Sequence, residues 1–130
     1  MTKLEAVKKQ YFSAVQRFEE VLEEKKTDIV RDSAIQRFEF TFDLSWKLIK
    51  AFLEDEKGIK CVSPKECFRE AYRQNLIDYD ELWIKMTDLR NKAIHTYGEK
   101  FADDFYKKLP EFLNLFQSLK KKIEEFLKSS

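Results

Sequence analysis

The chain has 130 residues, with 25 Lys+Arg against 24 Asp+Glu, one His, and only two Gly and two Pro. So few turn-forming residues exclude a β-sandwich, a barrel or a βαβ array, each of which needs a turn every ~8 to 12 residues. Nineteen aromatic residues, twelve of them Phe, exclude a disordered chain of mixed charge. The sequence therefore predicts a single all-α domain over residues 1–130, long enough to fold without disulfides or a structural metal.

Basic and acidic side chains are balanced along the chain, at 13 to 12 over residues 1–65 and 12 to 12 over residues 66–130. Neither half carries the basic field that drives generic binding to nucleic acids or membranes, so any RNA contact must be local. The start MTKLEAVKKQ has no apolar signal segment, and no stretch approaches the ~18 apolar residues of a membrane span. We expect a cytoplasmic protein with no membrane partner.

Two early segments carry apolar residues at three- and four-residue steps, which predicts two helices. The first runs from about Lys3 to Lys25 and buries Leu4, Val7, Tyr11, Ala14, Val15, Phe18 and Leu22. The second carries Ile35, Phe38, Phe42, Trp46, Ile49 and Leu53, with further apolar width from Phe40, Leu44 and Ala51. This second helix is expected to be central and to end at Gly58, because glycine suits the left-handed conformation after a helix.

Two shorter helices are predicted next from their capping residues. Ser63-Pro64-Lys65-Glu66 forms a capping box that starts a short helix ending at about Arg73. Asp78 is expected to cap the following helix, which ends near Gly98. Its predicted apolar stripe is Tyr79, Leu82, Met86, Leu89 and Ala93.

The last predicted helix contains a proline. Its apolar stripe keeps one phase through Pro110, which favours one long kinked helix over two helices, although an internal proline costs ~3 kcal/mol. The stripe consists of Phe101, Phe105, Leu109, Phe112, Phe116, Leu119, Ile123 and Phe126. Four long helices with short connections predict an up-and-down four-helix bundle, with the short third helix in the crossover.

The two cysteines, Cys61 and Cys67, have neither a zinc-binding spacing nor a CxxC redox spacing. We interpret both as reduced thiols that pack in the core. The carboxylates near the single histidine form no metal-ligand set either, so no metal or cofactor is predicted.

The segment around the only histidine is the candidate for chemistry, because histidine titrates near neutral pH. It reads DLRNKAIHTYGE and contains Arg90, Asn91, His95 and Tyr97. On a regular helix His95 lies about 140° from Arg90, and Tyr97 about 200° from His95. The three can converge if the helix frays near Ala93, or if two copies of the chain meet at this end.

An arginine and a histidine together match one reaction class. The guanidinium fork fits a phosphate, and the imidazole can take a proton near pH 7. In-line cleavage of RNA by its own 2′-hydroxyl needs both groups and no metal. The alternative is a surface histidine without a catalytic role.

At these residues the sequence resembles the HEPN-fold proteins that pair with minimal nucleotidyltransferases, also named nucleotidyltransferase substrate-binding proteins. Arg90, His95 and Tyr97 fill the family pattern of Arg, four residues, His, one residue, Tyr, and Asn91 is the polar residue favoured after the arginine. Residues 34–50 (AIQRFEFTFDLSWKLIK) resemble the family's second helix, and residues 64–83 its third helix and the entry to the fourth.

The resemblance implies the following roles. Arg90 and His95 would be the ribonuclease pair, supported by Asn91, in a cleft between two protomers of a homodimer. Tyr97 would accept AMP from the partner nucleotidyltransferase, which silences the nuclease, so that the chain is a toxin and the transferase its antitoxin. RNA is the implied substrate.

Two other interpretations stay open. In one, the chain is a non-catalytic subunit that presents substrate to the transferase. In the other, it is a helical adaptor whose motif is incidental and whose partner binds an exposed apolar stripe, for which the wide face of the second helix is the candidate.

Overall fold

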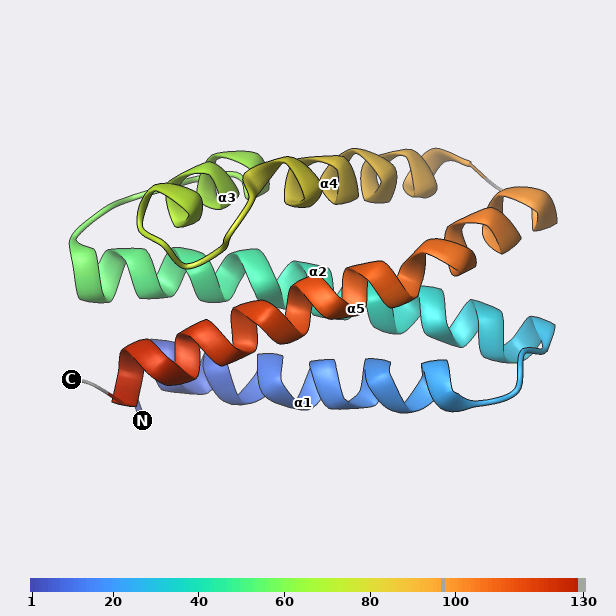
Figure 1. Cartoon of the computed structure of the whole chain (residues 1–130), viewed down its shortest axis with the longest axis horizontal. Helices are drawn as coiled ribbons and strands as arrows, with labels where there is room; N and C mark the ends of the chain where they lie inside the picture. Colours follow the sequence, from blue (N-terminus) through green and yellow to red (C-terminus); the bar gives the residue numbers. More distant parts are fainter. Residues whose placement is uncertain (97, 129–130) are drawn as a thin grey trace.

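The computed structural model describes residues 1–96 and 98–128, and of Asp80 the backbone only. That part of the chain forms five helices and no strand: α1 (Lys3–Glu23), α2 (Asp28–Lys57), α3 (Pro64–Arg73), α4 (Asp80–His95) and α5 (Glu99–Lys128). Helices α1, α2 and α5 pack against one another, and α3 and α4 run one after the other along a further side of α2 (Figure 1). The predicted all-α class is confirmed. Its finer description as a four-helix bundle stays a prediction.

Aromatic side chains join the helices in the core. Phe38 of α2 is fully buried and lies 5.3 Å from Phe112 of α5, measured between ring centroids. Trp83 of α4 lies 4.8 Å from Phe68 of α3 and 5.8 Å from Phe116 of α5. Ring pairs at these distances contribute about 0.5–1.5 kcal/mol beyond burial. Trp83 thus fixes the first half of α4 to the rest of the molecule.

Several predicted helix ends are confirmed. Gly58 follows α2 with φ of 66°, in the left-handed region where glycine carries no steric penalty. The Ser63 hydroxyl accepts a hydrogen bond from the Glu66 amide at 3.4 Å, and α3 ends at Arg73 as expected. Pro110 lies inside a continuous α5, because the packed apolar stripe on both sides offsets the lost backbone hydrogen bond.

The predicted start of α4 is wrong. The cap position is Tyr79 rather than Asp78, and no side chain caps the helix. Asp78 instead forms an ion pair with Lys122 of α5 at 3.7 Å. The predicted stripe also needs correction, because Tyr79 is 70% exposed while Trp83 is buried. Trp83 packs on Phe68 of α3 and Phe116 of α5, and local capping rules do not include these contacts between helices.

The interpretation of the cysteines as reduced thiols is also wrong, because Cys61 and Cys67 form a disulfide. Cys61 lies two residues before the cap Ser63, and Cys67 lies in the first turns of α3. The chain turns back on itself at this cap, so the two Cα atoms come within 5.2 Å. Both cysteines remain buried. Spacing along the sequence did not reveal this turn.

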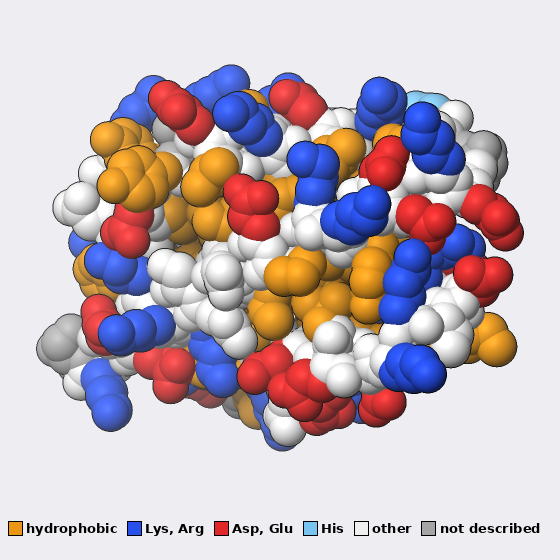
Figure 2. Space-filling view, turned by 45° about the vertical axis from the view of Figure 1, so that its right-hand side comes forward, with side chains coloured by type: hydrophobic (Ala, Val, Ile, Leu, Met, Phe, Trp, Pro, Cys, Tyr) orange, Lys and Arg blue, Asp and Glu red, His pale blue; other side chains and the backbone are white. Residues whose placement is uncertain are grey.

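The surface carries both signs of charge. Figure 2 shows Lys and Arg side chains interspersed with Asp and Glu around an area of exposed apolar side chains. None of the helices in the described part of the chain combines the length and apolar content that a bilayer-crossing helix requires.

Candidate functional site

The last two turns of α4 carry Arg90, Asn91 and His95, with Asn91 and His95 exposed. The helix is regular up to His95 and ends at Thr96, so it does not fray near Ala93. Arg90 and His95 therefore remain about 140° apart around the axis and about 7.5 Å apart along it. One protomer does not bring them onto one face. Tyr97 lies outside the residues that the structure describes.

The side chain of Arg90 is partly buried between α4 and α2. Its guanidinium carbon lies 5.1 Å from the ring centroid of Phe42, in cation–π geometry. Its Nη1 donates a hydrogen bond to the Asn91 side-chain oxygen at 3.2 Å. Its Nε is buried and has no hydrogen-bond partner among the described residues. The aromatic ring and the amide thus hold the guanidinium in place without neutralising it.

No carboxylate of the described residues pairs with Arg90. The nearest acid before it on α4, Asp88, forms an ion pair with Lys65 of α3 instead. A buried polar group without a partner costs about 1–3 kcal/mol. Arg90 thus has no carboxylate partner among the described residues, and its Nη2 makes no hydrogen bond to them, while a guanidinium fork matches a phosphate.

A hollow of about 340 Å³ lies under the α4–α5 connection. Its walls come from the start of α2, the end of α4 and the start of α5, and include Ala93, Thr96, Gly98, Phe101 and Phe105. Neither Arg90 nor His95 lines it. The hollow thus borders the motif but does not join its two chemical groups.

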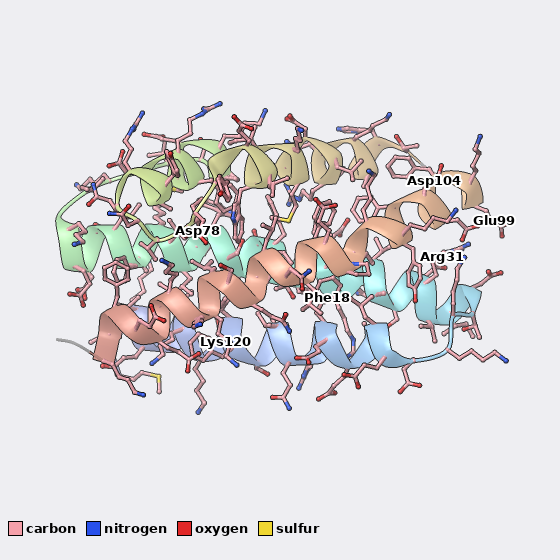
Figure 3. The ribbon with its side chains drawn as sticks, viewed as in Figure 1. Phe18, Arg31, Asp78, Glu99, Asp104 and Lys120 are labelled. Carbon is pink, nitrogen blue, oxygen red and sulfur yellow. A yellow bond between two sulfur atoms is a disulfide. The ribbon has the colours of Figure 1, made fainter. Side chains whose placement is uncertain are left out.

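Arg31 lies at the start of α2, at the same end of the molecule as Glu99 of α5 (Figure 3). It forms one wall of that hollow. It is 6% exposed and forms ion pairs with Asp32 at 2.9 Å, with Asp103 of α5 at 3.2 Å and with Asp28 at 3.6 Å. The hydrogen bond with Asp32 raises the pKa of Arg31 above its usual value, and the hydrogen bond with Asp103 is the next largest contribution. Because its charge is fully paired, this arginine is structural.

Asp103 is shared by two cations. It accepts a hydrogen bond from Lys26 at 2.9 Å and one from Arg31 at 3.2 Å, and these two bonds lower the pKa of its carboxyl group. The contacts tie the α1–α2 connection and α2 to α5, beside the end of α4. They fix the position of the helix that follows the motif.

Phe42 was missed as a functional candidate. The sequence pattern placed it in the core stripe of the second helix, and it is indeed fully buried. Its second role under Arg90 arises because α4 packs over this part of α2, which no local pattern reveals. No group of three or more His, Cys, Asp or Glu side chains in the described ranges can hold a metal ion.

Comparison with known proteins finds a matching family. The model of the family described as nucleotidyltransferase substrate binding protein like matches residues 7–125. A protein named probable ribonuclease HepT, from Haemophilus influenzae, is 36% identical over 93 residues, which cover 65% of this chain and 64% of that protein. The similarity thus spans somewhat less than two thirds of that relative's length.

Two solved structures share the fold. A Thermus thermophilus protein superposes with a TM-score of 0.78 at 32% sequence identity, over 84% of this chain and 94% of that one. HI0074 of Haemophilus influenzae superposes with a TM-score of 0.67 at 27% identity, over 93% and 96% of the two chains. The structure of HI0074 is described as the fold of a substrate-binding domain of a nucleotidyltransferase.

Proposed function

The chain belongs to the family of nucleotidyltransferase substrate-binding-like proteins, and from this premise we propose that it pairs with a minimal nucleotidyltransferase and is a metal-independent endoribonuclease. The observation that carries the nuclease proposal is the unpaired guanidinium of Arg90 on the Phe42 ring. Arg31, by contrast, is neutralised by carboxylates. An arginine without a carboxylate partner, on the same helix as the single histidine, suits a phosphodiester substrate.

The proposed reaction uses the RNA's own 2′-hydroxyl. His95 removes the hydroxyl proton as general base, and the 2′-oxygen attacks the adjacent phosphorus in line with the leaving 5′-oxygen. Arg90, oriented by Asn91, stabilises the additional negative charge on the phosphorane. The P–O5′ bond breaks, and the departing oxygen takes a proton from water, which leaves a 2′,3′-cyclic phosphate and a 5′-hydroxyl.

A second copy of the chain is part of the proposal. Because Arg90 and His95 face different sides of a regular α4, a single protomer does not offer both to one phosphate. A two-fold homodimer that joins the ends of two α4 helices brings the arginine of one protomer near the histidine of the other. Exposed apolar surface beside the motif, such as Ile94 at 44% exposure, supports such an interface.

Control by the partner completes the proposal. The transferase would transfer AMP from ATP to the Tyr97 hydroxyl, two residues after His95, with release of pyrophosphate. Phosphodiester-linked AMP adds bulk and negative charge at the cleft, which excludes RNA by size and by repulsion. The chain would then be the toxin of a toxin–antitoxin pair, with the transferase as antitoxin.

A non-catalytic substrate-binding subunit is the second candidate. It is favoured by the separation of Arg90 and His95 on one protomer, and by the description of HI0074 as a substrate-binding domain. In that case Arg90 would hold a phosphate for the transferase, and no RNA would be cut.

The deciding experiment is cleavage of a 5′-labelled RNA by the purified chain in EDTA. Arg90→Ala and His95→Ala are expected to lower the rate by about 10²-fold or more. Lys85→Ala, an exposed cation on the same helix, is the matched control and should cleave like the parent. Equal cleavage by all four proteins would overturn the assignment of Arg90 and His95 as the catalytic pair. No cleavage by a folded parent would favour the second candidate, a non-catalytic substrate-binding subunit.

Modification is tested by intact mass after co-expression with the transferase. Added AMP units that disappear in Tyr97→Phe support the proposed acceptor. An unchanged pattern of added AMP in that variant would contradict it.

A further inference from the structure

A second candidate binding surface lies on the other side of α2 from Arg90. Helices α1 and α2 leave an open groove of about 610 Å³ between them, which we name the α1–α2 groove. Its walls include Lys9, Gln10 and Arg17 from α1, and Gln36, Arg37 and Phe40 from α2. Since Phe40 and Phe42 are about 200° apart around α2, the groove and the Arg90 contact occupy opposite sides of this helix.

The charge of the groove differs from that of the whole chain. Its walls carry three basic residues, Lys9, Arg17 and Arg37, and no acidic one, whereas the chain as a whole has a net charge of only +1. None of the three pairs with a carboxylate in the described part of the chain. Asp43, on the next turn of α2, is neutralised by Lys47 at 2.8 Å. The groove is therefore complementary to an anion.

The arrangement of these cations suits an extended ligand. Lys9 and Arg17 are eight residues apart on α1, which is about 12 Å along the helix axis. Arg37 reaches across from α2 and donates from Nη1 to the backbone oxygen of Arg17 at 2.9 Å. That bond fixes Arg37 in position and leaves its other donors available.

An exposed aromatic ring and two amides complete the groove. Phe40 is 60% exposed, although α2 supplies many of the buried residues of the core. Gln10 and Gln36 are exposed beside it and offer both donors and acceptors. Proteins bind single-stranded nucleic acid with this combination of groups. Cations contact the phosphates, an aromatic face stacks on a base, and amides bind base edges.

A second copy of this chain fits the groove poorly. A two-fold interface centred there would place the same three cations opposite one another, which is repulsive. An acidic peptide would satisfy the cations, but it gives no reason for an exposed phenylalanine between two amides.

We propose that the α1–α2 groove binds a single-stranded segment of RNA, separately from the Arg90 motif. Phosphates lie along Lys9, Arg17 and Arg37, and a base stacks on Phe40. The site anchors the substrate at a distance from the cut and compensates for the near-zero net charge of the chain. The inference rests on the proposed function for its choice of RNA as the ligand.

The test is fluorescence anisotropy of a labelled 12-nucleotide oligouridylate with the full chain carrying His95→Ala, in EDTA, over a range of KCl concentrations. Adding Lys9→Ala and Arg17→Ala should weaken binding and reduce the slope of log Kd against log salt by about 1.4. Lys107→Ala with Lys108→Ala removes two exposed cations from α5 and is the matched control, with an unchanged slope.

Stacking is tested in the same assay. Phe40→Leu should weaken binding by about tenfold, and Phe40→Trp should retain it. Tyr79→Leu is the control, since Tyr79 is 70% exposed on another surface.

Equal oligouridylate affinities in the groove and control variants would refute the groove as a binding site. A labelled decaglutamate peptide that responds to the groove variants, while the oligouridylate does not, would overturn the inference in favour of a protein-docking site. Cleavage lost in His95→Ala but unaffected by the groove variants would also refute the groove. Cleavage retained in His95→Ala, by contrast, would refute the proposed catalytic pair and leave the groove to the binding assay.

Discussion

The guanidinium of Arg90 in α4 lies over the ring of Phe42 in α2, 5.1 Å from its centroid. The ring is fully buried and is itself held by Phe68, whose centroid lies 5.8 Å away. The arginine of the motif therefore depends on a rigid aromatic platform from another helix. An acid at this position would instead neutralise the charge that a phosphate needs.

Replacing the platform should slow RNA cleavage even where the chain stays folded. We expect Phe42→Leu to lower the cleavage rate by roughly 2- to 30-fold, because the cation–π contact contributes about 0.5–2 kcal/mol. Phe38→Leu is the matched control, since Phe38 is equally buried but does not contact Arg90. Both variants are compared at a temperature where circular dichroism shows them folded. Equal losses of cleavage rate in Phe42→Leu and Phe38→Leu would show that Phe42 has no specific role in positioning Arg90.

Stability should fall in acid through Asp103. Its contacts with Lys26 and Arg31 lower the pKa of its carboxyl group below the ordinary value of about 3.9. A carboxyl group whose pKa is lower in the folded state contributes its full stabilisation at pH values above its unfolded-state pKa. This contribution is lost as the pH falls through the folded-state pKa. Urea unfolding of the parent and of Asp103→Asn should therefore differ at pH 7, and the difference should shrink progressively as the pH falls below about 3.9. A constant difference over this range would contradict the assigned ion pairs.

The disulfide should stabilise the start of α3. In the chain-entropy model, closing so short a loop lowers the conformational entropy of the unfolded chain, which stabilises the folded state by about 2 kcal/mol. We expect the double variant Cys61→Ser, Cys67→Ser to lose about that much free energy of unfolding in urea. A reducing agent should destabilise the parent similarly and leave the double variant unchanged. A parent that is insensitive to reductant would argue that the two thiols are not joined.

Pro110 should be a site where the chain can be stabilised. It lies exposed inside α5, where proline removes one backbone hydrogen bond of the helix. Pro110→Ala should raise the free energy of unfolding by about 1–3 kcal/mol, measured with urea. Glu111→Ala, its exposed neighbour, should stay within about 0.5 kcal/mol of the parent. A destabilised Pro110→Ala would indicate that packing requires the proline's shape.

Much of the fold was predictable because its determinants are local. The apolar stripes of α1, α2 and α5 repeat over many turns, and Gly58 and Ser63 mark helix boundaries by conformational preferences that a few residues decide. The start of α4 was not predictable, because Asp78 is used by an ion pair with α5 that local rules do not include.

The all-helical class and several helix boundaries follow from the sequence alone, since helix periodicity and capping act over a few residues. Tertiary packing accounts for the rest. It joined Cys61 to Cys67, kept α4 regular so that Arg90 and His95 remain apart, and set Arg90 on Phe42 without an acid. It also gathered the cations of the α1–α2 groove. These relationships depend on how helices pack across the chain, and packing geometry is not contained in the spacing of residues along it.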